Sequence, residues 1–449
     1  MGIISKSFRW AAFLMLTYTG NVYAAQKTDG IFPFKDGDIV GVIGDSITEH
    51  AYYVNFMELW TVTRFPTANI RFRNVGKGSD TAPGGASRFQ ACVVPIQPTV
   101  LTVDYGMNDA SYRAFDTKIF ETYKAGLQNI ANQAKAMNTR VIWITPQPVE
   151  PSAENKKLGD YVEYNVTLSE FAKRLKPFAE ANNGLYIDQF HPYLAVLEKA
   201  RVDDPLRRIN GGDWIHPSPP GGALMASIIL KAMSFPSLVS LAEIDAGSLK
   251  STITRQCEIT ELKADPNGGL QFRRLDAALP YFPDPVVGKK SPAQPSASAI
   301  LQWAPILEDL NKYMLKVAGL KPGPYEIKLN GEKVAVYSDA QLAQGVNLAG
   351  PALEKGPIAN QVREVINAVT AKNLYFHDKI FRGIMDYRVS APPFVKNPKP
   401  ILADIEKQKA ISLVKRLEEM PKYDEAIRKT LELKSHLVEI TPVADKELK

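Results

Sequence analysis

Hydrophobic and polar positions follow two alternating periods along the first half of the chain. Longer stretches with one apolar helical face separate short apolar or alternating runs. The runs lie at 38–43, 69–75, 99–105, 140–145 and 184–188, and the helical stretches at 52–65, 115–137, 162–181 and 221–233. Strands that helices separate need crossover connections, which favour a mainly parallel sheet with both faces covered. The expected fold class is α/β, an α/β/α sandwich of about five parallel strands.

A different pattern begins near residue 240. Residues 279–296 are rich in proline and predict a loop or linker, and three strand-like runs follow at 313–317, 325–329 and 333–337. Asn330-Gly331 fits the tight turn of a hairpin between the last two runs. Residues 355–435 are largely helical and charged. We therefore expect an α/β domain at 25–240, a β-rich accessory segment at 241–350 and a helical C-terminal region at 351–449.

The first residues have the three parts of a signal peptide. Lys6 and Arg9 precede a short apolar run at 10–18, and Val22-Tyr23-Ala24 offers a cleavage site with small residues. The competing interpretation is a membrane anchor, but this run is well short of the roughly 20 residues that span a bilayer. We expect residues 1–24 to be removed and the protein to be exported, periplasmic or secreted, with no stable membrane insertion afterwards.

Composition and charge narrow the set of partners. The chain is 45% hydrophobic and 23% charged, as in ordinary globular proteins. Loss of Lys6 and Arg9 with the signal peptide takes two charges from the net charge of +6, and the small excess that remains is spread out, so no nucleic-acid partner is expected. The two cysteines and scattered histidines lack the spacing of a metal site, and no phosphate-binding loop occurs. We expect neither a metal nor a cofactor.

The two cysteines leave two arrangements open. Cys92 and Cys257 can pair in an oxidising compartment and so join the first domain to the second. They can equally be two separate buried thiols, and the sequence favours neither.

A candidate nucleophile follows the first strand. In Gly44-Asp45-Ser46, a serine at a strand-to-helix turn is held in the open, beside backbone N–H groups that can face a developing oxyanion. The tripeptide alone is weak evidence, because Asp and Ser often only cap a helix.

Asp213-Trp-Ile-His216 strengthens the case. A serine hydroxyl needs a base, usually histidine, and the histidine needs a carboxylate that fixes its tautomer. A spacing of three brings Asp213 and His216 to one side of a turn, and the prolines after His216 favour a rigid loop. The other histidines lack this context, and His50 is expected to serve in helix packing.

Two further segments offer oxyanion donors. Asn108, in Gly106-Met107-Asn108-Asp109 after the third strand, can donate a side-chain N–H, although an Asn can also simply shape a turn. The loop at 74–81 has small residues that let a backbone N–H approach a substrate, and its alternative is a plain flexible loop.

These segments, in this order, resemble the SGNH, or GDSL, hydrolase family over roughly residues 35–235. The resemblance implies Ser46 as nucleophile, Asp213 and His216 as its acid–base pair, and the N–H of Ser46 and the amide of Asn108 as oxyanion donors. One segment departs from the pattern: the chain has Gly78-Ser79-Asp80 where the family usually has Ser-Gly-Asp or Gly-Gly-Asp. Since the donor there is a backbone N–H, Ser79 can supply it, or Gly78 after a small shift.

The resemblance implies a carboxylic ester hydrolase that acts on a small acyl ester or an acetylated polysaccharide. The layout is similar to that of exported bacterial multidomain members, which favours removal of acetyl groups from carbohydrate. A lipase or lysophospholipase-like esterase is the first alternative. A polysaccharide O-acetyltransferase of the same fold and a non-catalytic carbohydrate-binding protein are the others.

Overall fold

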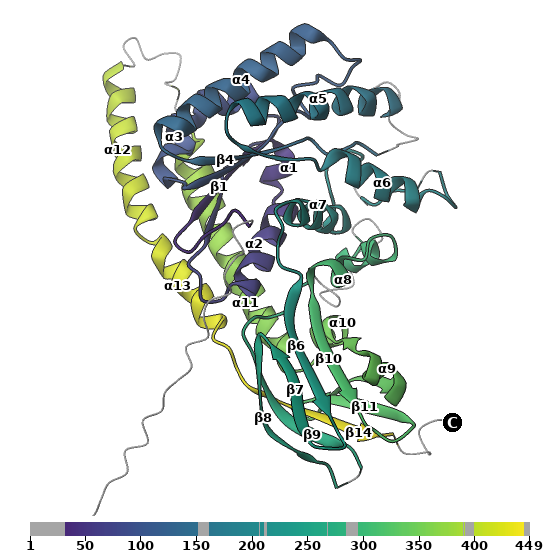
Figure 1. Ribbon diagram of the computed structural model, residues 1–449. Helices are drawn as coiled ribbons and strands as arrows, with labels where there is room; N and C mark the ends of the chain where they lie inside the picture. The colour runs from purple at the N-terminus through teal and green to yellow at the C-terminus, as the bar shows by residue number, and fades with distance from the viewer. Residues whose placement is uncertain are drawn as a thin grey trace, which may run out of the picture.

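The computed structural model describes residues 32–150, 161–205, 207–210, 213–266, 268–283, 295–388, 390 and 399–443 (Figure 1). The expected signal peptide, residues 1–24, lies outside this part. No helix within these ranges has the length and apolarity that crossing a bilayer requires.

A parallel sheet of five strands forms the centre of the first domain. Its strand order is β2-β1-β3-β4-β5, and the strands are β1 (Ile39–Gly44), β2 (Arg71–Asn74), β3 (Val100–Asp104), β4 (Arg140–Ile144) and β5 (Leu185–Ile187). Gly44 lies opposite Asp104, and Val42 lies opposite Asn74. The carboxyl ends of the three strands that precede Ser46, the 76–80 loop and Asn108 therefore meet at one edge. The predicted α/β fold with a five-stranded parallel sheet is confirmed.

Helices cover this sheet on both faces. In Figure 1 the sheet lies between a layer that includes α4 and a layer that includes α2. Contacts join α3 to α4 and α2 to α7. The helices of the domain are α1 (Ser46–Glu49), α2 (Tyr52–Arg64), α3 (Ala82–Cys92), α4 (Thr117–Ala136), α5 (Tyr161–Ala181), α6 (Phe190–Ala200) and α7 (Pro219–Ala232).

Two further sheets follow in the accessory part, with strand orders β13-β10-β6-β7 and β12-β11-β14-β9-β8. The strands are β6 (Leu238–Asp245), β7 (Lys250–Arg255), β8 (Cys257–Ala264), β9 (Leu270–Asp276), β10 (Lys312–Ala318), β11 (Pro324–Leu329), β12 (Glu332–Ser338), β13 (Val346–Asn347) and β14 (His436–Pro442). The predicted hairpin at Asn330-Gly331 joins β11 to β12. Short helices also belong to this part: η3 (Ala297–Gln302), α8 (Ile306–Leu310), α9 (Asp339–Gln344) and α10 (Ala349–Glu354).

The region expected to be helical from 351 onward contains one strand as well. Helices α11 (Pro357–Tyr375), η4 (Phe376–Met385), α12 (Lys399–Leu417) and α13 (Met420–Thr430) precede β14. β14 lies between β11 and β9 and is antiparallel to both. The end of the chain therefore completes the sheet that residues 257–338 began, and the C-terminal region is not purely helical.

The C-terminal helices pack on the α/β domain through buried ion pairs. Lys372 of α11 contacts Glu58 of α2, and its Nζ lies 3.1 Å from the carbonyl oxygen of Phe72. Arg73 of β2 forms a two-pronged contact with Asp424 of α13, at 2.5 and 3.2 Å. Buried charges need such partners, so these pairs fix where α11 and α13 lie on the domain. Figure 1 shows α11 beside α2, although the two helices are far apart in the sequence.

Candidate active site

Ser46 is the first residue of α1, directly after β1 and the turn residue Asp45. The Asp45 side chain caps the helix by accepting the Ile47 N–H at 2.9 Å. Burial raises the pKa of Asp45 to about 7. The first N–H groups of a helix have no partner within it, so the N–H of Ser46 is placed to face an oxyanion.

Asp213 and His216 complete a hydrogen-bonded chain with Ser46. His216 Nδ1 lies 2.7 Å from Asp213 Oδ2, and His216 Nε2 lies 2.8 Å from Ser46 Oγ. The other Asp213 oxygen accepts the backbone N–H of His216 at 2.7 Å. One neutral tautomer satisfies both ring contacts: Nδ1–H donates to the carboxylate, and Nε2 accepts the serine proton. The structure thus brings together the three residues that the sequence identified as nucleophile, base and orienting acid.

The pKa shifts of Asp213 and His216 suit the role of His216 as a base. Partial burial acts to raise the pKa of Asp213, but hydrogen bonds from the ring and backbone of His216 outweigh it and lower that pKa to about 2. The hydrogen bond to Asp213 raises the pKa of His216, against the opposing effect of burial. Asp213 therefore stays ionised while His216 gains basicity, as a proton-accepting histidine requires.

The candidate oxyanion donors are not equivalent. Asn108 donates one amide N–H to the Asp80 carbonyl oxygen at 2.9 Å and accepts the Tyr112 hydroxyl at 2.7 Å. An amide has two N–H groups, so one remains. The Gly78 N–H is engaged by Glu49 Oε2 at 2.6 Å, whereas the Ser79 N–H meets no acceptor within the described part of the chain. The geometry thus favours Ser79 over Gly78 as the backbone donor.

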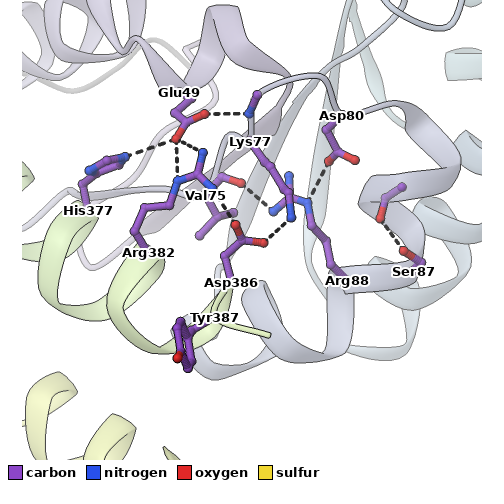
Figure 2. Close-up of polar contacts among 12 residues, drawn as sticks. Glu49, Val75, Lys77, Asp80, Ser87, Arg88, His377, Arg382, Asp386 and Tyr387 are labelled. Carbon is purple, nitrogen blue, oxygen red and sulfur yellow. Dashed lines mark hydrogen bonds and ion pairs between the residues drawn. The ribbon is translucent and has the colours of Figure 1, made fainter. Parts of the chain in front are cut away.

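Ser79 adopts a left-handed backbone conformation, with φ of 58°. Glycine adopts this conformation at no steric cost, and the family to which the sequence is similar usually has glycine at this position. Other side chains hold the loop in place. Arg88 Nε lies 2.7 Å from Asp80 Oδ2, and Arg88 Nη1 donates to the Val75 carbonyl oxygen at 2.6 Å (Figure 2). The contacts of Arg88 with Asp80 and Val75 therefore stabilise the turn at Ser79.

Sequence reasoning missed the position of His50. It was expected to pack in a helix, but its ring lies against the ring of His216, with centroids 4.6 Å apart. Burial and the nearby His216 charge lower the pKa of His50. His50 also lines a cleft of about 200 Å³ between α1–α2 and α11–η4. A histidine one turn after Ser46 was the available signal in the sequence.

A second Ser–His–Asp cluster was also missed. His191 Nδ1 lies 2.7 Å from Asp188 Oδ2, and His191 Nε2 lies 3.2 Å from Ser169 Oγ. The sequence analysis set His191 aside, although Asp188 precedes it by three residues as Asp213 precedes His216. Ser169 lies inside α5, however, where its N–H bonds within the helix, so this cluster lacks the backbone donors found at Ser46.

The structure separates the two cysteines. Cys92 of α3 and Cys257 of β8 are both buried free thiols, which matches the second of the two arrangements left open by the sequence. Within the described residues, no group of three or more His, Cys, Asp or Glu side chains is placed to hold a metal ion.

Comparisons with known proteins agree with the geometry. Residues 42–224 match the family described as GDSL-like Lipase/Acylhydrolase. No curated protein matches the chain.

Three solved structures show the extent of the similarity. BT4096, a gut microbial diltiazem-metabolizing enzyme, is 25% identical with a TM-score of 0.76, over 92% of this chain and 99% of its own. Axe2, an acetylxylan esterase from Geobacillus stearothermophilus, is 21% identical with a TM-score of 0.37, over 45% of this chain and 96% of its own. LAE5, an alpha/beta hydrolase enzyme from the metagenome of Lake Arreo, Spain, is 23% identical with a TM-score of 0.38, over 46% and 99%. The first similarity extends over the α/β domain and the accessory part together.

Proposed function

We propose that this carboxylic ester hydrolase, whose residues 42–224 match the GDSL-like lipase/acylhydrolase family, is an exported enzyme that removes small acyl groups, above all acetyl, from carbohydrate. One observation carries the catalytic part of the proposal: the unbroken chain of hydrogen bonds from Asp213 through His216 to Ser46. The cleft beside His50 supports the carbohydrate substrate, and the N-terminal residues support export.

The first half of the reaction forms an acyl-enzyme. His216 Nε2 takes the Ser46 proton as Oγ attacks the ester carbonyl, and Asp213 stabilises the imidazolium that results. The N–H groups of Ser46 and Ser79 and the free amide N–H of Asn108 hold the oxyanion. His216 then returns the proton to the leaving alcohol oxygen as the C–O bond breaks.

Water completes the cycle by the same path. His216 removes a proton from a water molecule, whose oxygen attacks the acyl carbon. Collapse of the second tetrahedral intermediate gives the proton to Ser46 Oγ and releases the carboxylic acid. No group other than these side chains and water is needed to balance the reaction.

The cleft beside His50 supports a hydroxyl-rich alcohol. Two of its lining residues have polar groups that meet no hydrogen-bond partner within the described part of the chain, the imidazole of His50 and the amide N–H groups of Asn55, and these can exchange hydrogen bonds with sugar hydroxyls. Leu374 adds an exposed apolar surface at 57% accessibility. A lipase-like esterase that binds a long acyl chain in an apolar pocket is the second candidate. The N-terminal residues with signal-peptide character support export.

The test is a substrate panel with purified protein. We expect acetate release from acetylated xylooligosaccharides without an added acceptor, and aryl ester activity that falls steeply as the acyl chain lengthens. Ser46→Ala, which folds because the side chain is small and partly exposed, should show neither. Diltiazem belongs in the panel because BT4096 metabolizes it. Preference for long-chain esters would overturn the carbohydrate assignment, and acetyl transfer to a sugar in place of hydrolysis would indicate a transferase.

A further inference from the structure

The C-terminal region reaches the loop that carries the oxyanion donor. η4 continues α11 and lies beside residues 76–80, which follow β2 (Figure 2). Arg382 of η4 donates from Nε to Glu49 Oε1 at 2.6 Å, and its Nη1 donates to Asp386 Oδ2 at 2.6 Å. Asp386 also contacts Lys77 Nζ at 2.5 Å. Arg382 and Asp386 thus each make one ionic contact with the α/β domain around this loop, to Glu49 and to Lys77.

Glu49 is the link between the nucleophile and the loop. It is the last residue of α1, which begins with Ser46, and its Oε2 accepts the Gly78 N–H at 2.6 Å. This bond holds the Lys77–Gly78 peptide unit, which comes just before the Gly78–Ser79 unit that carries the Ser79 N–H. Without this bond Gly78 could rotate, because glycine has a wide choice of backbone conformations, and that rotation would turn the Ser79 N–H away from a substrate oxygen.

Arg382 also offsets the negative charge of Glu49 near the oxyanion donors. A carboxylate next to the oxyanion donors would repel the negative charge that develops in the transition state. Burial acts to raise the pKa of Glu49, but hydrogen bonds from His377, Arg382 and the Gly78 N–H lower it to about 2, so the group is charged at working pH. Arg382 lies against this charge and offsets it.

We propose that Glu49 and Arg382 are positioning residues for ester hydrolysis, through which the C-terminal helical region holds the Ser79 N–H in place for the oxyanion. The inference rests on the proposed function, since it assumes that Ser79 donates to the oxyanion. Glu49 lines the cleft beside His50, so the test uses an aryl acetate, which has no sugar hydroxyls to bind there. The contribution of Glu49 and Arg382 appears in the transition state, and so in kcat more than in KM.

The decisive experiment compares full-length variants on an aryl acetate, with circular dichroism and melting curves for each. We expect Arg382→Ala and Glu49→Ala to lower kcat about tenfold to a hundredfold with KM within about twofold, a part of the loss for removing one oxyanion donor. Arg382→Lys should restore part of kcat. Glu49→Gln keeps an acceptor for the Gly78 N–H without the charge, so adding Arg382→Ala to it should cost much less than Arg382→Ala costs in the parent.

Asp309→Asn is the matched control. It weakens another ion pair between the α/β domain and the accessory part, Lys231–Asp309, which joins α7 to α8 away from the loop. This variant should keep the parent kcat. The positioning role is wrong if Arg382→Ala and Glu49→Ala also keep kcat within twofold. It is also wrong if their losses of kcat are additive in a variant that carries both Glu49→Ala and Arg382→Ala. Retained hydrolysis in Ser46→Ala would instead overturn the proposed function itself.

Discussion

At the scale of single residues, His216 undergoes the charge change on which the reaction depends. Its pKa is raised above the ordinary value of about 6.5 by the bond to Asp213, and only the neutral ring can accept the Ser46 proton. We therefore expect kcat/KM to fall as pH drops through a value above about 6.5. Asp213→Asn removes the charge that favours the imidazolium, so the acid limb should move to lower pH while the maximal rate drops by orders of magnitude. An unchanged limb in Asp213→Asn would contradict the pairing.

The oxyanion donors give a contrast between two variants. Ser79 donates through its backbone and has a φ of 58° that glycine adopts readily, so Ser79→Gly should keep most activity and stability. Asn108 donates through its side chain, so Asn108→Ala should lose roughly a hundred- to a thousandfold in kcat. Steady-state kinetics of the two variants side by side provide the measurement. Equal damage from both would mean that the Ser79 hydroxyl itself takes part.

The two Ser–His–Asp clusters offer a further comparison. The N–H of Ser46, at the start of α1, meets no acceptor among the described residues, whereas the N–H of Ser169 lies inside α5. We expect a fluorophosphonate probe to label Ser46 and to leave Ser169 unmodified, as read by peptide mass spectrometry. Ser169→Ala should hydrolyse an aryl acetate at the parent rate. Labelling that survives in Ser46→Ala and disappears in Ser169→Ala would show that Ser169, and not Ser46, is the nucleophile.

Part of the site was predictable because its parts are local in sequence. Asp213 and His216 are three residues apart, and Ser46 follows a recognisable strand, so pattern and chemistry were visible together. The Glu49–Arg382 contact joins residues 333 positions apart. The sequence around Glu49 does not point to Arg382, and the sequence around Arg382 does not point to Glu49. For that reason only the structure shows that the Gly78 N–H is bonded to Glu49 and that Ser79 is the available backbone donor.

At the scale of elements, strong periodicity was the reliable signal. The five strands and the long helices of the first domain had it and were found within a few residues of their ends. α3 was missed because it begins Ala82-Pro83-Gly84-Gly85, which reads as a loop, although Thr81 caps it by accepting the Gly84 N–H. β14 was missed because its seven residues follow a long charged helical stretch and pair with strands far back in the chain.

One buried ion pair contributes strongly to the docking of α11 on α2. Lys372 and Glu58 are at most 2% exposed, and burial lowers the pKa of Lys372. Removing one partner leaves the other charge buried alone, so Lys372→Ala should lower the free energy of unfolding by about 3–5 kcal/mol. Lys355→Ala breaks an exposed pair with Glu332 and should cost less than about 1 kcal/mol. Chemical denaturation of both variants tests this, and similar small losses would mean that packing alone holds α11.

At the scale of the whole molecule, the chain crosses between its two parts repeatedly. It leaves the α/β domain at β6, returns through α11 to α13, and crosses back to place β14 in the accessory sheet. The helices that support the active-site loop are therefore anchored at both ends by strands of the accessory part. This connectivity explains why the accessory part and the catalytic machinery are expected to depend on one another.

From the position of β14 we predict that the fold depends on the last strand of the chain. Truncation before His436 removes a strand that is hydrogen-bonded to both β9 and β11, and it opens two unpaired strand edges in the accessory sheet. It also removes the buried side chains of Val438 and Ile440 from the core. We expect this variant to be insoluble or to melt well below the parent, and what remains soluble to hydrolyse an aryl acetate poorly because η4 loses its support. Truncation after Val443 is the control and should leave melting and activity unchanged. A soluble, fully active protein without β14 would show that the two parts function independently.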